Sequence, residues 1–419
     1  MTAVSDGLVL HPFRALRPAV DDARLGALLC PPYDVIDEGE RARLLQADQD
    51  NAVALILPRT ADGSDPYAAA ARQLDDSVHA GLYRVDADPA LYVYEMRDAT
   101  GAVTRGLLGA VELRDPSAGV ILPHENTMAG PVADRLALMT ATETNLEPIY
   151  LVYDGGGAAT EAVRVADAGS PIAQATTPDG ITHRLWAIED RATLEAIEAD
   201  LRPRKALIAD GHHRYATYRE IQRLFGEQRG PGPWDSGLTL LVDSSQYGPQ
   251  VHAIHRVLVG LPLETALDAL GPTVQRRPVD SPDAGLAAID GLDGFAAVLT
   301  NGSQSLVISD PEGALSALAR RDGEPAELAD LDVTVLHRGL VEGTWKLDDT
   351  VDVVGYAHSV DDAIEAARTS GGTAVLLRPT PVAAVAAVAA AGARMPRKST
   401  LFTPKPASGL VMRRFADDS

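Results

Sequence analysis

The 419-residue sequence has a single cysteine, Cys30, and few aromatic residues, which make up 5% of the chain. One cysteine rules out an intrachain disulfide and a metal cluster held by several thiolates. Basic residues are also scarce, with 37 Lys and Arg against 59 Asp and Glu, and the formal net charge is -22. Broad binding to nucleic acid or to an anionic membrane needs a positive field, so we expect neither.

Long apolar runs are missing as well. The longest run of alanine and valine, residues 382–391, is far too short to span a bilayer, and the N-terminal residues lack a basic segment followed by an apolar one. We therefore expect a cytoplasmic protein without a secretory signal.

With 46% hydrophobic residues, the chain is long enough for two or three domains with buried cores. We divide it into an N-terminal and central α/β region (1–255), an accessory α/β subdomain (256–345) and a C-terminal α/β segment (346–419) whose basic loop returns to the core. Proline, glycine and apolar spacing predict the elements within these regions. We expect helices at 66 onward, 131–142, 190–201 (capped by Asp190), 328–340 and 360 onward, and strands at 91–97, 103–113, 148–154, 183–188, 238–242, 295–300, 306–309, 351–355 and 373–377.

The most informative stretch is ADGHHRY at residues 209–215. It follows the apolar run 206–208 and opens a segment, 215–225, with helical spacing, so we expect a strand, a tight turn and a helix. A helix N-terminus has unpaired N–H groups and a positive dipole end, which attract anions. Gly211 would let the backbone turn sharply or approach a ligand closely.

The side chains of this turn strengthen the prediction of an anion site. His212, His213 and Arg214 supply donors and positive charge that suit phosphate oxygens. Asp210 is the only acid in the motif and would be the local base or a magnesium ligand. The alternative is an aspartate N-cap followed by exposed cations, but an ordinary helix start favours acids in its first turn.

Two loops carry further candidates and leave alternatives open. His124 and Glu125 stand side by side, and such a pair serves as a general base, a metal ligand or a hydrogen-bonded loop. The prolines at 31–32 place Tyr33 and Asp34 on a loop, where Asp34 would either cap the next helix or contact a substrate. The three glycines at 155–157 lack a following lysine and predict a turn and not a phosphate loop.

Basic residues outside the central turn predict further phosphate contacts. Arg256 ends a basic cluster, and we favour a phosphate contact for it over a metal site. The C-terminal loop places Lys398, Ser399, Thr400 and Lys405 in a Pro-rich stretch of an otherwise acidic chain. It is not a P-loop, because an arginine stands where the second glycine is needed. It would be a phosphate clamp or a solvated basic loop.

Six motifs together resemble a family catalogued as domain of unknown function 1015. They are PPYDVI (31–36), HENT (124–127), ADGHHRY (209–215), HRV (255–257), GYAHS (355–359) and MPRKSTLFTPKPASGLV (395–411). The DGHHR turn is also similar to the signature of the ParB/sulfiredoxin superfamily, which includes free-serine kinases. The resemblance implies a mixed-sheet ParB/sulfiredoxin-like core with additional α/β elaborations. It also implies phosphoryl transfer from ATP (or ADP) to a free hydroxyl amino acid, with L-serine favoured as the acceptor.

The resemblance also implies roles for the residues above. Asp210 or Glu125 would take the hydroxyl proton, and the other would help to hold Mg2+. The implied nucleotide-binding residues are Gly211, His212, His213, Arg214, Arg256, Lys398, Ser399, Thr400 and Lys405, and the implied substrate-binding residues are Tyr33, Asp34 and His124. The partners would be a nucleotide and a small amino acid, with neither nucleic acid nor membrane. A nucleotide-binding regulatory module and a phosphoester hydrolase are the alternatives.

Overall fold

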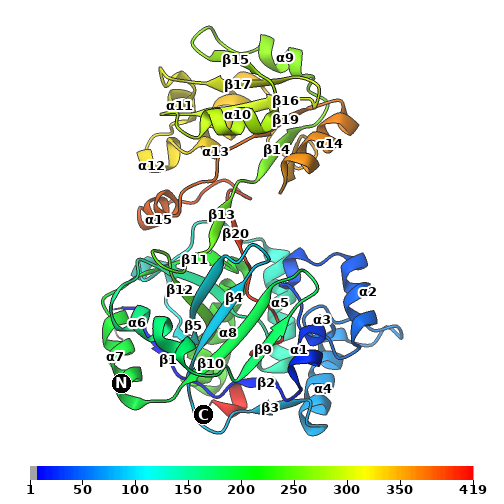
Figure 1. Cartoon of the computed structure of the whole chain (residues 1–419), viewed down its shortest axis with the longest axis vertical. Helices are drawn as coiled ribbons and strands as arrows, with labels where there is room; N and C mark the ends of the chain where they lie inside the picture. The colour runs from blue at the N-terminus through cyan, green and yellow to red at the C-terminus, as the bar shows by residue number, and fades with distance from the viewer. Residues whose placement is uncertain (1–6, 419) are drawn as a thin grey trace. The chain divides into compact units, whose positions relative to one another are not determined.

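The computed structural model describes residues 7–418 (Figure 1). These residues form two compact units. Unit 1 contains the residues up to Pro123, Thr127–Pro249 and the residues from Pro404 onward, and unit 2 contains His124–Asn126 and Gln250–Thr403. No helix in the described range is both long and apolar enough to cross a membrane.

Unit 1 is organised around a nine-stranded sheet in the order β6-β11-β8-β12-β5-β4-β10-β9, with β1 also pairing with β5. The strands are β1 (Leu10–His11), β4 (Leu91–Arg97), β5 (Val103–Glu112), β6 (Ile121–Leu122), β8 (Ile149–Tyr153), β9 (Ala173–Thr176), β10 (Thr182–Ile188), β11 (Ala206–Asp210) and β12 (Ser236–Asp243). β6 and β11 run parallel, as do β8 and β12, whereas the other pairs are antiparallel. The sheet is mixed, and the predicted α/β fold class is confirmed.

Helices and two short strand pairs complete unit 1. The pairs are β2 (Leu16–Pro18) with β3 (Tyr83–Val85), and β7 (Thr144–Asn145) with β21 (Arg413–Arg414). The α-helices are α1 (Asp22–Leu28), α2 (Glu38–Ala47), α3 (Val53–Ile56), α4 (Pro66–His79), α5 (Ala129–Thr142), α6 (Gly157–Val165), α7 (Arg191–Leu201) and α8 (His212–Arg229), and the 3-10 segments are η1 (Tyr33–Val35), η2 (Pro116–Ala118), η3 (Ala166–Ala168), η4 (Pro233–Asp235) and η6 (Phe415–Asp417). The main core packs Leu107 and Ile208 of the sheet with Ile197 of α7 and Tyr215 and Tyr218 of α8.

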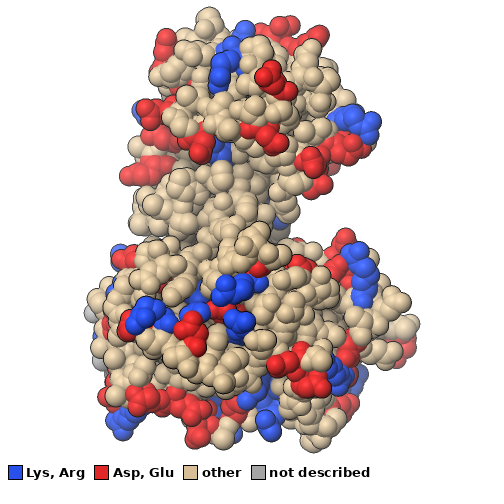
Figure 2. Space-filling model, viewed as in Figure 1, with Lys and Arg blue, Asp and Glu red and all other residues tan. Residues whose placement is uncertain are grey.

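The most deeply buried acid of the sheet is paired with arginines on both neighbouring strands. Glu95 on β4 is fully buried, and the register places it opposite Arg105 on β5 and Arg184 on β10. Both guanidinium groups pair with its carboxylate, Arg184 at 3.3 Å. A buried charge is tolerated when it is paired and hydrogen-bonded in this way. On the face that Figure 2 shows, basic and acidic side chains likewise lie close to one another.

The elements predicted for residues 1–255 are largely confirmed. Asp65 caps α4 by accepting from the Tyr67 amide, and Pro66 occupies the first helical position, as expected for a Ser-Asp-Pro start. Asp190 caps α7 through the Thr193 amide. The strands predicted at 91–97 and 103–113 are β4 and β5, which pair as an antiparallel hairpin.

Unit 2 contains a six-stranded antiparallel sheet in the order β15-β17-β16-β19-β14-β18, and a separate pair, β13–β20. Its strands are β13 (Gln250–His252), β14 (His255–Leu258), β15 (Gln275–Val279), β16 (Ala296–Thr300), β17 (Ser305–Ser309), β18 (Val354–Ala357), β19 (Thr373–Leu376) and β20 (Leu401–Thr403). Its helices are α9 (Leu263–Asp268), α10 (Pro282–Ile289), α11 (Ala314–Ala319), α12 (Ala326–Ala329), α13 (Asp332–Thr334), the π-helix η5 (Val335–Thr344), α14 (Val360–Ser370) and α15 (Val382–Ala390).

Two predictions for unit 2 differ from the structure. The single helix expected at 328–340 is divided into α12, α13 and the π-helix η5. The strand expected at 351–355 begins only at Val354, because residues 351–353 form a turn in which the Val353 and Val354 amides both donate to the Thr350 carbonyl. The segment boundaries at 255 and 345 stay a prediction, although strands from both sides of 345 share one sheet, as β16 and β19 do.

A buried histidine of unit 1 predicts acid sensitivity. The His183 ring lies 2.8 Å from Tyr94 Oη and 3.0 Å from Thr177 Oγ1, and burial lowers its pKa from 6.5 to about 4. Between these two pH values the unfolded chain binds this proton and the folded chain does not. Stability therefore falls as the pH drops through this window, by about 3 kcal/mol in total, and the loss is complete below pH 4.

This expectation can be checked by urea unfolding at several pH values between 7 and 4. His183→Asn should flatten the dependence of the unfolding free energy on pH, because the titrating ring is gone. His79→Asn, a change at an exposed histidine of the same unit, should leave that dependence as in the wild type. Equal slopes in His183→Asn and the wild type would contradict the assignment.

Candidate anion-binding site

The predicted strand, turn and helix are confirmed at β11, Gly211 and α8. Gly211 is the N-cap residue, with φ 89° and ψ 31°, and no side chain caps the helix. The first helical hydrogen bond runs from the Tyr215 amide to the Gly211 carbonyl at 2.8 Å. The positive end of an 18-residue helix therefore starts directly after Asp210, in the left-handed conformation that glycine adopts without strain.

Gly211→Ala should disturb this turn in two ways. A left-handed alanine costs about 1–2 kcal/mol, and its Cβ would lie 3.1 Å from Arg214 Nε and 3.2 Å from Nη2. We expect a lower unfolding midpoint and weaker phosphate binding. Gly226→Ala is the matched control, because a Cβ added at this position in α8 meets no atom within 4 Å, and alanine there should stabilise the helix by about 0.5–1 kcal/mol. Thermal unfolding of both variants tests this, and equal midpoints would contradict it.

Four charged residues form a connected network at this helix start. Lys405 Nζ lies 2.7 Å from Asp210 Oδ1 and 3.0 Å from Asp34 Oδ2. Arg214 Nη2 lies 2.5 Å from Asp210 Oδ2, and Arg214 Nη1 donates to the Pro148 carbonyl. The side chains of Lys405 and Asp210 are each 14% exposed and that of Arg214 is 4% exposed. Two cations thus hold one carboxylate, one on each oxygen.

The network keeps its charges at neutral pH. Burial lowers the pKa of Lys405, but the carboxylates of Asp210 and Asp34 raise it by more, so its pKa lies above the usual value. Burial raises the pKa of Asp34, and Lys405 and Arg214 outweigh this effect, so the pKa lies below its usual range. Each shift favours the charged form, which is the state that an ion-pair network needs.

Arg214 retains one unused donor. Its Nε is buried and has no hydrogen-bond partner among the described residues, although a guanidinium normally uses its donors when buried. The same Nε is an atom that a Cβ on Gly211 would approach to 3.1 Å. Glycine at position 211 therefore keeps a side chain away from this unpaired N–H group, and a positively charged N–H donor of this kind suits an oxyanion.

Asp34 does not cap a helix. Asp37 caps α2 by accepting from the Glu40 amide, so the capping alternative for Asp34 is wrong. The side chain that a cap would have used is instead bound to Lys405. Tyr33 lies on the same 3-10 turn, with its ring under the Arg135 guanidinium at 4.2 Å.

Sequence reasoning missed a buried carboxylate next to this network. Glu147 is 5% exposed, and its Oε1 accepts from the Tyr33 amide at 3.1 Å and from Ser408 Oγ at 3.0 Å. Arg135 Nη1 lies 3.7 Å from its other oxygen. Ser408 belongs to a C-terminal motif that carried the resemblance, whereas Glu147 follows no pattern that spacing could reveal. It joins the loop of Tyr33 to the C-terminal segment of unit 1.

The two histidines of the turn are placed differently. His212 is 8% exposed, and His213 Nε2 accepts a hydrogen bond from the Met128 amide at 3.0 Å. This nitrogen of His213 is therefore engaged with the backbone at the start of α5. The phosphate contacts predicted for both histidines stay predictions.

The remaining predicted residues belong to unit 2. His124 is fully buried, and its Nε2 lies 3.1 Å from Thr400 Oγ1. Ser399 Oγ donates to the Pro396 carbonyl, and Lys398 is exposed with φ 56°. Arg256 is fully buried, and Glu125 lies on the loop after His124. The structure thus groups Asp210, Arg214, Lys405, Asp34 and Tyr33 within unit 1.

Magnesium was predicted at Asp210 and Glu125. Both oxygens of Asp210 pair with cations, so in this arrangement the carboxylate is not available as a metal ligand. Among residues 7–418 no group of three or more His, Cys, Asp and Glu side chains is arranged to hold a metal ion. The magnesium site stays a prediction, and no step below depends on it.

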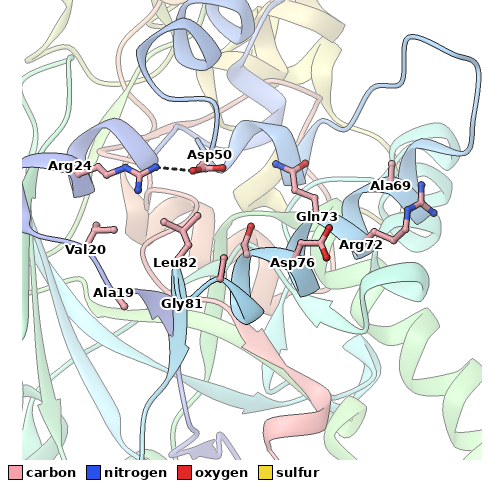
Figure 3. Close-up of a pocket in the computed structure, with 12 residues that line it drawn as sticks. Ala19, Val20, Arg24, Asp50, Ala69, Arg72, Gln73, Asp76, Gly81 and Leu82 are labelled. Carbon is pink, nitrogen blue, oxygen red and sulfur yellow. Dashed lines mark hydrogen bonds and ion pairs between the residues drawn. The ribbon is translucent and has the colours of Figure 1, made fainter.

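Two other places in unit 1 differ from this site. Gly155 and Gly156 precede α6, and Gly157 is its first residue. Two acids accept hydrogen bonds at this helix start: Asp200 from the Ala159 amide and Asp243 from the Gly156 amide. This supports the predicted turn over a phosphate loop. A surface pocket of about 720 Å³ is lined by α1, α4 and neighbouring loops, with Arg24 paired to Asp50 across it (Figure 3). It contains none of the residues predicted from sequence.

The chain is similar to known proteins in sequence and in fold. A family model described as protein of unknown function, DUF1015, matches residues 10–334. A solved free serine kinase in complex with AMP is 18% identical at a TM-score of 0.33, covering 68% of this chain and 83% of that chain. A conserved hypothetical protein from Pyrococcus furiosus is 15% identical at a TM-score of 0.33, covering 71% of this chain and 94% of that chain. SbnI with a C-terminal truncation from Staphylococcus aureus is 10% identical at a TM-score of 0.37, covering 73% of this chain and 86% of that chain. No curated protein matches the sequence.

Proposed function

The chain belongs to the DUF1015 family of proteins of unknown function, and we propose that it is a phosphotransferase. In this proposal it transfers a phosphoryl group from ATP, or from ADP, to the hydroxyl group of a free amino acid, with L-serine favoured. The catalytic centre is the network of Asp210, Arg214, Lys405 and Asp34 at the start of α8.

One observation supports this proposal most strongly. Lys405 is a largely buried lysine that two carboxylates hold beside the uncapped N-terminus of α8. Phosphoryl transfer needs positioning and positive charge around the transferred group more than covalent chemistry. A lysine, a buried guanidinium with an unpaired N–H group and a helix dipole supply these features together at the start of α8.

The network also offers a proton acceptor. An incoming phosphate competes with Asp210 for Lys405, and when Lys405 turns to the phosphate it releases Asp210 Oδ1. That oxygen then accepts the hydroxyl proton of the acceptor while the hydroxyl oxygen bonds to phosphorus. The bond between phosphorus and the oxygen of the leaving nucleotide breaks, and the leaving oxygen keeps the electron pair. Asp34 holds Lys405 from the other side and acts as a positioning residue.

The predicted roles of the residues in unit 2 remain part of the proposal. Glu125 is the alternative base, and His124 is a predicted substrate contact. Lys398, Ser399 and Thr400 are predicted nucleotide contacts on a basic, hydroxyl-bearing loop.

The test is nucleotide turnover by the full chain with a panel of free amino acids led by L-serine, with and without magnesium. We expect nucleotide consumption that depends on serine and produces O-phosphoserine in equal amounts. Turnover without an acceptor would indicate the hydrolase, and nucleotide binding without turnover would indicate the regulatory module. Either result would overturn the kinase assignment.

A further inference from the structure

The hydroxyl group of Tyr150 is buried and has no hydrogen-bond partner among the described residues. Tyr150 stands on β8, in the central sheet of unit 1, and its side chain is fully buried. Tyr92 lies in the same cross-strand row, but its hydroxyl group donates to Asp86 at 3.0 Å. A buried donor without an acceptor destabilises a fold, and phenylalanine would avoid this cost, so the Tyr150 hydroxyl group requires an explanation.

A β-bulge brings Asp210 to the same face of the sheet as Tyr150. β11 and β8 pair antiparallel, and Ile208 lies opposite Leu151. The register then shifts by one residue, so that Asp210 lies opposite Tyr150. Without this shift Asp210 would lie opposite Ile149 and point, like Ile208, into the main core. Bulges re-aim single side chains in this way and are frequent beside functional sites.

The charge of Asp210 acts on the Tyr150 hydroxyl group. Burial raises the pKa of Tyr150 well above its usual value, and the Asp210 carboxylate raises it further. The phenol therefore keeps its proton at neutral pH and remains a donor. Lys405 and Arg214 hold the two carboxylate oxygens of Asp210 at 2.7 Å and 2.5 Å. An unused donor thus stands next to a carboxylate that the proposed reaction releases from one of its two cations.

We propose that Tyr150 is a positioning residue for Asp210, and that its hydroxyl group donates to this carboxylate when Lys405 turns to the phosphate. The inference rests on the proposed function, in which Asp210 is the base. A carboxylate has about four lone-pair sites, so Asp210 can bind Arg214 and Tyr150 and still accept the proton of the substrate hydroxyl group. The new hydrogen bond replaces the contact with Lys405 and keeps the carboxylate in place.

Thermal unfolding tests this exchange of partners without any turnover. In the wild-type background, Tyr150→Phe should raise the unfolding midpoint by about 2–4 °C, because it removes a buried donor that has no acceptor. Lys405→Met imitates the departure of the lysine, and in that background the hydroxyl group has Asp210 as its acceptor. Adding Tyr150→Phe there should lower the midpoint by about 2–4 °C. The effect of one substitution should thus change sign.

Tyr83→Phe is the matched control. Tyr83 is also a fully buried tyrosine of unit 1 whose hydroxyl group has no partner among residues 7–418, but it packs with Leu16 and Cys30 in a separate core cluster. Tyr83→Phe should raise the midpoint equally in both backgrounds and leave turnover unchanged. Equal shifts for Tyr150→Phe in the two backgrounds would overturn the inference.

Turnover distinguishes a positioning role from a structural one. Tyr150→Phe should lower kcat with L-serine by at least about tenfold and change the KM values for nucleotide and serine by less than about twofold, since the hydroxyl group acts on the base and on neither substrate. A kcat equal to that of Tyr83→Phe would overturn the inference, and this comparison decides it if Lys405→Met does not fold. If the wild type phosphorylates no acceptor, the proposed function fails, and the change of sign in stability alone decides the inference.

Discussion

Lys405→Met should lower nucleotide turnover by at least about a thousandfold. Methionine keeps the length of the side chain but removes the charge that meets the transferred phosphoryl group, and loss of one such group costs about 10²–10³ in rate in comparable sites. The loss should be larger here, because Lys405 is also the cation that Asp34 and Asp210 share, so its removal disturbs the position of both carboxylates. Steady-state turnover and nucleotide affinity of the purified variant measure it.

The variant should also be less stable, by about 3 kcal/mol, because breaking a largely buried ion pair leaves charge unpaired. Turnover is therefore compared at a temperature where both proteins are folded. Lys205→Met is the matched control, since Lys205 is an exposed lysine just before β11 in the same unit. If Lys205→Met and Lys405→Met lose the same small fraction of activity, Lys405 has no part in catalysis.

Asp210→Asn has the second large expected effect. The asparagine side chain has the same shape, but it carries no charge to pair with Lys405 and Arg214. It also cannot act as the base that takes the proton of the substrate hydroxyl group. We expect turnover to fall by at least about a thousandfold, within the range for removing a general base together with its positioning charge. Stability should fall by about 3–5 kcal/mol, because Arg214 is buried and Asp210 is the carboxylate that contacts it.

Asp154→Asn provides the comparison for Asp210→Asn. Asp154 pairs with Arg204 at 3.2 Å, but its side chain is 86% exposed, so its loss should change neither turnover nor stability measurably. Full turnover in Asp210→Asn would contradict the assignment of Asp210 as the base and would favour Glu125, the alternative base.

A double-mutant cycle joins these two predictions. The effects of substitutions within one ion-pair network are not additive. The fold loss of turnover in the double variant Lys405→Met, Asp210→Asn should therefore be much smaller than the product of the two single losses. The double variant should also lose less unfolding free energy than the two single variants together, because it removes both charges of the pair at once. Strictly additive losses would mean that the two side chains act independently.

The turn at residues 209–215 could be predicted because its signals are local. An apolar strand, a glycine and a helical repeat stand next to one another in the sequence, and β11 and α8 confirm this order. The ion-pair network could be predicted only in part. Asp210 and Arg214 are four residues apart on one turn, but Lys405 and Asp34 come from distant segments that only the fold brings together.

Other features left no trace in the local pattern. Asp34 and Asp37 are equally good caps by residue type, and the backbone path decides that Asp37 caps α2. The π-helix η5 follows the same apolar spacing as an α-helix, so 328–340 was predicted as one regular helix. Glu147 is separated from Tyr33 by 114 residues and from Ser408 by 261 residues, so only the fold brings these partners together.

The most direct test of the account is calorimetric titration of ADP into the wild type and into Lys405→Met, with Lys205→Met as control. If the start of α8 binds nucleotide phosphates through Lys405 and Arg214, the wild type and Lys205→Met bind ADP equally. Lys405→Met should then bind at least about a hundredfold more weakly, which corresponds to a loss of about 3 kcal/mol. Equal affinity in all three proteins, or no binding by the wild type, would contradict the assignment of this turn as the nucleotide site.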